Sequence, residues 1–243
     1  MNLNIWQIFV LALLQGVTEL FPISSLGHTV ILPGLLGWGD LVRNQQFLPL
    51  VVALHLGTSI ALVVYFWRDW YQVGRTLAVS VKRGEIRTGT QEWVGWLIII
   101  GCIPAGLLGV SLETPLKQLF ATPLVAASFL VVNGCILFVG EVLRRRAERR
   151  DTNSLAKRPG GKTRPLAELS WREALLVGLA QSLALIPGIS RSGVTMVAGL
   201  GVRLSHEDAA RYAFLLGTPL IGAAAILELP QLFGLPTITL LLV

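Results

Sequence analysis

Charged residues are scarce in this sequence. Asp, Glu, Lys and Arg make up 14% of its 243 residues, against about 25% in an ordinary soluble domain. Apolar residues make up 53%, and the mean hydropathy is +0.66. This balance argues against a soluble enzyme, a nucleic-acid-binding module and a disordered chain. Several apolar stretches reach the length of about 20 helical residues that crosses a bilayer core. The sequence therefore predicts an all-α polytopic membrane protein, with 1–243 forming one integral membrane domain.

Cysteine is scarce too. Cys102 and Cys135 are the only two, and each lies inside a separate apolar run. A disulfide framework needs more cysteines in a small secreted chain, so we interpret both as small apolar side chains. The first nine residues lack a basic residue and a small-residue cleavage site, so a cleaved signal peptide is not expected.

Long apolar runs separate into complete and interrupted segments. Complete spanning helices are predicted at about 47–67, 92–112, 122–143 and 208–229. The regions 5–37 and 171–203 are also apolar, but Pro, Gly and Ser interrupt each in the middle. Interrupted backbone at membrane depth is tolerated only where protein or a water-filled cavity satisfies its polar groups. We expect each region to form a helix–loop–helix hairpin that enters and leaves the membrane on one side.

Basic residues predict the orientation. Five of the 20 Lys and Arg residues lie in 68–87 and nine lie in 144–164. Two spans separate these loops, so both lie on one side, which the positive-inside rule makes cytoplasmic. We interpret 144–170 as a flexible basic loop beside anionic lipid. This placement of the basic residues accounts for the net charge of +6 and the pI of about 9.9, so no nucleic-acid partner is expected.

An internal repeat links the two interrupted regions. Segments 23–29 and 189–195 align without gaps and match at Ile, Ser, Gly and Thr, and Leu56-Gly57-Thr58 corresponds to Leu216-Gly217-Thr218. Chance similarity between Gly- and Ser-rich apolar segments is the alternative. The charge rule gives the repeats opposite orientations: repeat one at about 1–143 and repeat two at about 171–243. Inverted repeats with broken helices are typical of transporters, whose binding site lies where the broken segments meet.

Polar residues inside membrane segments are costly and tend to be functional. The two hairpins carry Gln15, Glu19, Ser24, Ser25, His28, Gln181, Ser190, Arg191, Ser192 and Thr195. This set suits a phosphate. Arg191 offers a planar fork of donors, and the turn up to Gly193 offers backbone N–H groups at the start of a helix. Glu19 can hold a divalent cation, His28 can move a proton, and Ser24 or Ser25 can attack phosphorus.

Structural explanations compete with these roles. Glu19 and Arg191 can neutralise each other without chemistry, His28 can bond between packed helices, and Ser192 can serve close helix packing. We expect no catalytic role for the remaining polar residues near span ends, which are His55, Glu113, Glu141, His206, Asp208 and Glu228.

Two long motifs carry a resemblance to a known family. Residues 15–19 (QGVTE) with 22–28 (PISSLGH), and residues 187–195 (PGISRSGVT), resemble the two signatures of the bacterial undecaprenyl-diphosphatases, also called bacitracin resistance proteins. The resemblance implies a multi-pass protein of the bacterial inner (plasma) membrane with its active site facing the periplasm or cell exterior. The implied reaction removes the terminal phosphate of undecaprenyl diphosphate, regenerating the lipid carrier for peptidoglycan synthesis and conferring bacitracin resistance. It also implies a divalent cation, Mg²⁺ or Ca²⁺.

The resemblance also assigns roles to residues. Glu19, Ser25, His28 and Arg191 match the family's second acid, proposed nucleophile, histidine and phosphate-binding arginine. The predicted substrate-binding set is Ser24, Ser190, Arg191, Ser192, Gly193 and Thr195, and the predicted metal ligands are Glu19 and Gln15.

Three departures from the family pattern stand out. Gln15 replaces a common Glu, which weakens a two-carboxylate metal site, and Leu26 replaces a common Thr. The sequence stops at Val243 inside an apolar run where relatives usually continue for about two helices, so we expect a truncated chain or a short member.

Two other function classes stay open at this point. A lipid-phosphate flippase or small-anion transporter could use the same inverted-repeat pocket without cleaving phosphate. A structural membrane subunit would leave the intramembrane polar cluster unexplained. The expected partners are a polyprenyl diphosphate and membrane lipids, and the sequence gives no oligomeric state.

Overall fold

The fold is all-α, as predicted. The computed structural model describes residues 4–42, 47–112, 115–116, 119, 122–154 and 163–232, and within them the chain is helical apart from short connections and one isolated bridge between Arg164 and Leu204. The helices are α1 (Ile5–Leu20), α2 (Ser25–Leu35), α3 (Gly39–Val42), α4 (Phe47–Tyr65), α5 (Trp67–Arg83), α6 (Gln91–Ser111), α8 (Pro123–Ser154), η1 (Leu166–Glu168), α9 (Trp171–Ser182), η2 (Leu183–Leu185), α10 (Arg191–Gly201) and α11 (His206–Leu232).

Three of the four predicted membrane spans are confirmed as single helices, and the fourth, predicted at 47–67, is part of a bent pair. Three helical stretches are long and apolar enough to cross a bilayer: Gln91–Ser111, Pro123–Val142 and His206–Leu227. Helices α4 and α5 form a pair bent by 78° that adds a fourth. Their outward side chains are largely apolar, as lipid contact requires; Leu107, Val131 and Phe138 are examples. The chain is a multi-pass membrane protein.

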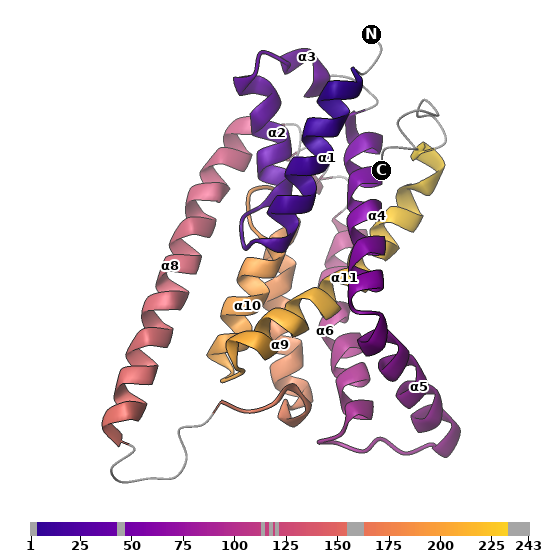
Figure 1. The fold of residues 1–243 in the computed structure, drawn as a ribbon, viewed down its shortest axis with the longest axis vertical. Helices are drawn as coiled ribbons and strands as arrows, with labels where there is room; N and C mark the ends of the chain where they lie inside the picture. Colours follow the sequence, from indigo (N-terminus) through magenta and orange to yellow (C-terminus); the bar gives the residue numbers. More distant parts are fainter. Residues whose placement is uncertain are drawn as a thin grey trace.

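Both interrupted regions form broken-helix hairpins. The first consists of α1 and α2, with its break at 21–24, and the second consists of α9, η2 and α10, with its break at 186–190. Figure 1 shows the indigo hairpin and the orange hairpin approaching from opposite ends of the molecule, with their breaks meeting at mid-height. The predicted hairpins are therefore present, whereas an inverted relation between complete repeats stays a prediction.

The two basic segments contain more helix than expected. Residues 67–83 form α5, which buries Val73 and Ser80 and ends at Gly84, whose φ of 68° suits glycine. The predicted loop from 144 begins as a continuation of α8 to Ser154. Glu141 stabilises this continuation, because Arg144 and Arg145 pair with it one turn further along. Part of the predicted loop, 155–162, lies outside the described residues. Figure 1 places α5 and the C-terminal end of α8 at the same end of the molecule, as the charge rule required.

Close helix packing fixes the second hairpin against the spans. Gly178 of α9 lies so near the carbonyl of Gly101 in α6 that a Cβ at position 178 would overlap it. Tyr212 of α11 is fully buried and donates a hydrogen bond to the Leu97 carbonyl at 2.8 Å. The helices α6, α9 and α11 therefore form a packed unit that supports the second break.

Candidate active site

The two breaks have the same local construction. Each second helix starts at a serine N-cap: the Ser24 hydroxyl accepts from the Gly27 N–H, and the Ser190 hydroxyl accepts from the Gly193 N–H, both at 3.2 Å. An N-cap serine satisfies a backbone donor that the first helical turn leaves unpaired. Both breaks therefore direct a helix N-terminus into the middle of the molecule.

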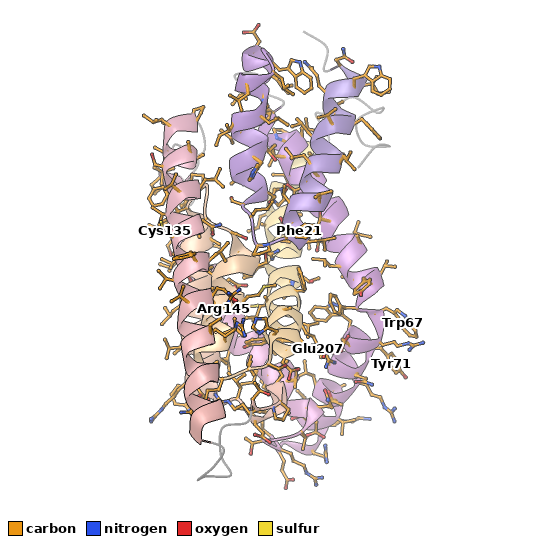
Figure 2. All side chains as sticks on the ribbon, turned by 60° about the vertical axis from the view of Figure 1, so that its left-hand side comes forward. Phe21, Trp67, Tyr71, Cys135, Arg145 and Glu207 are labelled. Atoms are coloured by element: carbon orange, nitrogen blue, oxygen red, sulfur yellow. The ribbon has the colours of Figure 1, made fainter. Side chains whose placement is uncertain are left out.

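The breaks are in direct contact. The Ser192 hydroxyl donates to the Phe21 carbonyl at 3.4 Å, and a Cβ at Gly27 would lie 3.2 Å from the Cα of Gly188. Figure 2 labels Phe21 at the end of α1, where the first hairpin meets the second. Gly188 has a φ of 98°, which L side chains rarely adopt. A glycine is therefore needed where this turn crosses α8.

Asn133 of α8 joins both breaks. Its Nδ2 donates to the Pro22 carbonyl at 3.3 Å, and its Oδ1 accepts from the Ser190 N–H at 2.9 Å. Only 2% of the residue is exposed. We did not predict this residue from the sequence, although an amide in the middle of the apolar run 122–143 was the available signal.

Glu19 is the centre of the polar cluster. Arg191 Nη2 donates to its Oε1, which forms an ion pair between residues 172 positions apart. Ser25 Oγ donates to Oε2 at 2.7 Å, and Gln15 Nε2 donates to the same oxygen at 3.1 Å. Glu19 is 8% exposed, and a buried carboxylate needs such partners. The structure thus brings together the acid, the serine and the arginine that the sequence singled out.

A cavity of about 400 Å³ opens beside this cluster. Its polar lining includes Glu19, Ser25 and Arg191, together with Ser24, Ser190 and Ser192. The rest of the lining is mostly apolar and small, with Gly106 and Gly109 from α6 and Ala224 from α11 among it. The volume falls in the range of small-molecule sites. A polar end joined to an apolar wall suits an anionic headgroup attached to a hydrocarbon chain.

Gly217 of α11 provides the space for Arg191. A Cβ at position 217 would overlap both Nη1 and Cζ of the guanidinium. The glycine of the Leu216-Gly217-Thr218 block therefore has a steric function. Arg191 Nη1 is buried against Gly217 and has no hydrogen-bond partner among the described residues.

Four predicted site residues are absent from the cavity lining: His28, Gly193, Thr195 and the predicted metal ligand Gln15. His28 Nδ1 lies 2.6 Å from the Ser24 carbonyl oxygen, Thr195 donates to the Arg191 carbonyl at 2.7 Å, and Gly193 packs against Leu137 and the Pro22 carbonyl. These contacts stabilise the breaks, and the roles in substrate binding and proton transfer stay predictions.

The histidine that lines the cavity is His55 of α4. Its Nδ1 lies 2.8 Å from the Val51 carbonyl oxygen, which orients the ring. We expected no catalytic role for it from the sequence. Its position directly before the repeated Leu56-Gly57-Thr58 block was the signal that could have identified it.

The residues present fit a divalent cation shared with a phosphate. Among the described residues no three His, Cys, Asp or Glu side chains form a metal-binding group, so the protein does not provide a complete coordination shell there. Glu19 supplies one carboxylate, and Gln15 Oε1 is a buried oxygen without a partner among the described residues. Mg²⁺ commonly binds one or two carboxylates together with substrate phosphates. Glu19 and Gln15 would supply the protein oxygens of such a site.

The fold and site define a class: a polytopic helical membrane protein with a cavity, lined at one end by Glu19, Ser25 and Arg191, where two broken hairpins meet. Residues 8–241 match the model of the bacitracin resistance protein BacA family. The chain belongs to this family.

The relatives are similar over most of their length. The undecaprenyl-diphosphatase of Mycolicibacterium paratuberculosis is 45% identical, with 96% of this chain and 80% of the relative aligned. Undecaprenyl-diphosphatase 2 of Frankia alni is 42% identical, covering 96% of this chain and 82% of the relative. The Acidiphilium cryptum undecaprenyl-diphosphatase is 44% identical, covering 91% and 73%.

Proposed function

We propose that this protein is a membrane phosphatase that hydrolyses undecaprenyl diphosphate to undecaprenyl phosphate and inorganic phosphate. The observation that carries the proposal is the meeting of Glu19, Ser25 and Arg191 at the polar end of an otherwise apolar cavity. The family membership and the names of the relatives point to the same reaction. The product is the lipid carrier of cell-wall synthesis, and its regeneration underlies bacitracin resistance.

Binding of the diphosphate uses Arg191 and the N-terminal end of α10. Arg191 Nη1 has no partner among the described residues, so it can donate to a phosphate oxygen while Nη2 stays paired with Glu19. The N-terminal end of α10, where Ser190 and Ser192 lie, adds hydroxyls and a favourable helix dipole. The polyprenyl chain then extends along the apolar wall between α6 and α11.

Phosphoryl transfer starts from the hydrogen bond between Ser25 and Glu19. Glu19 takes the proton of the Ser25 hydroxyl as Oγ forms a bond to the terminal phosphorus, and the bond from this phosphorus to the bridging oxygen breaks. Undecaprenyl phosphate leaves with the bridging oxygen, and a water then hydrolyses the phosphoserine. In the alternative, Glu19 deprotonates a water that attacks directly. Arg191 stabilises the charge on the transferred phosphoryl oxygens.

A divalent cation, Mg²⁺ or Ca²⁺, bound by Glu19 and Gln15 would neutralise phosphate charge. We assign to His28 an assisting role in proton transfer, as the family resemblance implies, while Glu19 takes the Ser25 proton; the histidine that lines the cavity is His55.

We place the protein in the bacterial inner membrane with its site facing the periplasm or cell exterior. Support comes from α5 and the C-terminal end of α8, two basic segments that lie at one end of the molecule, which the positive-inside rule makes cytoplasmic. The hairpin that carries Glu19 and Ser25 enters from the other end. The substrate then reaches the cavity from the membrane itself.

The test is phosphate release by the purified 243-residue chain in detergent micelles. With undecaprenyl diphosphate and Mg²⁺ or Ca²⁺ we expect stoichiometric inorganic phosphate and undecaprenyl phosphate. A flippase or anion carrier would bind the lipid without releasing phosphate, and that result would overturn the proposal. Ser25→Ala decides the nucleophile: a loss of about 10²-fold or more in kcat supports attack by Ser25, whereas activity near that of the unmodified chain supports attack by water.

A further inference from the structure

Gln181 is a buried side chain whose polar atoms have no protein partner. It lies in the last turn of α9 and is 1% exposed. Neither its Nε2 nor its Oε1 makes a hydrogen bond within the part of the chain that the structure describes. Buried amides are nearly always hydrogen-bonded because leaving one unpaired costs free energy. A partner from outside the protein is therefore expected.

The position of Gln181 identifies where that partner lies. Its side chain lines the same cavity as Arg191 and Ser190. Arg191 Nη1 is the other buried donor of this cavity without a partner in the described residues. Two unpaired donors, one cationic and one neutral, beside the same cavity are the pattern that an anionic ligand satisfies.

The first hairpin shows a glutamine whose Nε2 has a carboxylate partner inside the protein. Gln15 occupies the matching part of α1, and its Nε2 donates to Glu19 four residues later. Four residues after Gln181 the chain has Leu185, so α9 offers no carboxylate in that place. The carboxylate that Gln15 finds inside the protein is missing for Gln181, and a bound phosphate would replace it.

We propose that Gln181 is a substrate-binding residue whose Nε2 donates a hydrogen bond to a phosphate oxygen of the diphosphate, beside Arg191. This proposal names a contact of the active site and rests on the proposed function for the identity of the phosphate. A neutral amide adds a hydrogen bond to the phosphate without a second positive charge. It therefore does not compete with Arg191 for the carboxylate of Glu19. The amide oxygen then accepts from a phosphate O–H or a cavity water.

Gln181→Leu tests the contact because leucine has a similar volume and no polar atoms. Without ligand, this variant should be as thermally stable as the unmodified chain or more stable, since an unpaired buried amide is removed. Its kcat/KM for undecaprenyl diphosphate should fall about ten- to a hundredfold, as for the loss of a hydrogen bond to a charged group. Gln181→Glu should lose more, because a carboxylate repels the phosphate. A purely structural role predicts a lower unfolding temperature for Gln181→Leu instead.

Two additions keep the outcome separate from that of the proposed function. Methylenediphosphonate, which cannot be hydrolysed at its bridge, should raise the unfolding temperature of the unmodified full chain in micelles, and should require about ten- to a hundredfold more analogue for the same shift in Gln181→Leu. Gln72 on α5 is exposed and outside the cavity lining, so Gln72→Leu and Gln72→Glu serve as matched controls.

Each outcome is decisive. Analogue binding that weakens only in the Gln181 variants supports the contact, even if no phosphate is released and the proposed reaction fails. Binding and kcat/KM within about twofold of the unmodified chain would overturn the contact and leave the proposed reaction standing. Destabilisation of ligand-free Gln181→Leu with unchanged analogue affinity would also overturn it.

Discussion

The two hairpins share a backbone design and differ in charge. Both break after a glutamine-bearing helix, and both restart at a serine that caps the N–H three residues later. The first hairpin carries the carboxylate of Glu19, and the second carries the guanidinium of Arg191. Because an unpaired buried charge is costly, neither hairpin is stable at this depth alone. The comparison indicates that the duplicated scaffold positions the groups, and the unlike charges combine them into one site.

Helices α8 and α11 contact the two hairpins in different ways. Helix α8 contacts both breaks through one amide, Asn133, whereas α11 makes room for Arg191 of the second hairpin at Gly217. The Asn133 contacts constrain both hairpins, whereas Gly217 affects only the second hairpin, which carries Arg191. Substitutions at these positions can therefore separate the contributions of the two hairpins.

Removing either charge should have the largest effect. Arg191→Ala leaves Glu19 without its cationic partner and the phosphate without its principal donor, so we expect kcat to fall by about 10³-fold. The kcat of Glu19→Gln should fall by a similar factor, because this substitution removes the general base. Arg191→Lys keeps the charge but loses the planar fork of donors, so its kcat should lie between those of the unmodified chain and of Arg191→Ala. Phosphate release in micelles measures all three.

Arg211 provides the matched control for this pair. It forms an ion pair with Asp69, between α11 and α5, and neither residue lines the cavity. Arg211→Ala should leave kcat within a few-fold of the unmodified chain. If Arg211→Ala and Arg191→Ala reduced kcat equally, the Glu19–Arg191 pair would be no more than a structural ion pair.

Gly217→Ala should produce an intermediate loss that is confined to the second hairpin. The added methyl overlaps the guanidinium, so Arg191 must leave its position beside Glu19. We expect about a 10- to 100-fold loss in kcat, smaller than for Arg191→Ala because the displaced arginine keeps its charge.

The control is Gly222→Ala on the same helix. A Cβ at position 222 meets only Ser59 Oγ, at 3.6 Å, which is ordinary contact. Its activity should stay close to that of the unmodified chain. Equal losses in the two variants would show that α11 itself is sensitive to alanine, and would remove Gly217 from the account of Arg191.

Hydropathy and charge patterns were sufficient for the fold and for the centre of the site. The spans are set by apolar length, and the breaks are set by Pro22 and Pro187, so both could be read locally. We predicted that Glu19 and Arg191 converge because matching interruptions at membrane depth need a shared polar environment, and the structure brings the two side chains together.

The remaining features depend on helix rotation and on contacts between helices distant in the sequence. His28 ends the motif at 22–28 and His55 directly precedes the Leu56-Gly57-Thr58 block, but neither position tells which ring faces the cavity. The packing of α4 turns His55 toward it. The basic segment 68–87 was expected to be a loop because hydropathy does not separate a loop from an amphipathic helix. The role of Asn133 in joining the two breaks depends on the position of α8 beside both of them, which the sequence does not give.

Asn133 gives the smallest expected effect and the sharpest comparison between hairpins. Asn133→Leu leaves the Pro22 carbonyl and the Ser190 N–H without this partner, which should destabilise the chain by about 1–3 kcal/mol, seen as a lower unfolding temperature. Asn133→Asp keeps an acceptor for Ser190 and loses the donor to Pro22. The Ser190 amide should therefore exchange its hydrogen faster in Asn133→Leu than in Asn133→Asp.

Cys135 lies two residues along α8 and is exposed, and Figure 2 labels it there. Cys135→Leu should change neither the unfolding temperature nor the exchange of the Ser190 amide, which assigns any effect at 133 to the amide. If Asn133→Asp keeps Ser190 protected yet loses as much activity as Asn133→Leu, the first hairpin is the one that α8 must hold for catalysis. If activity instead follows Ser190 protection, the second hairpin is the one held, because only its backbone N–H depends on the oxygen that aspartate retains.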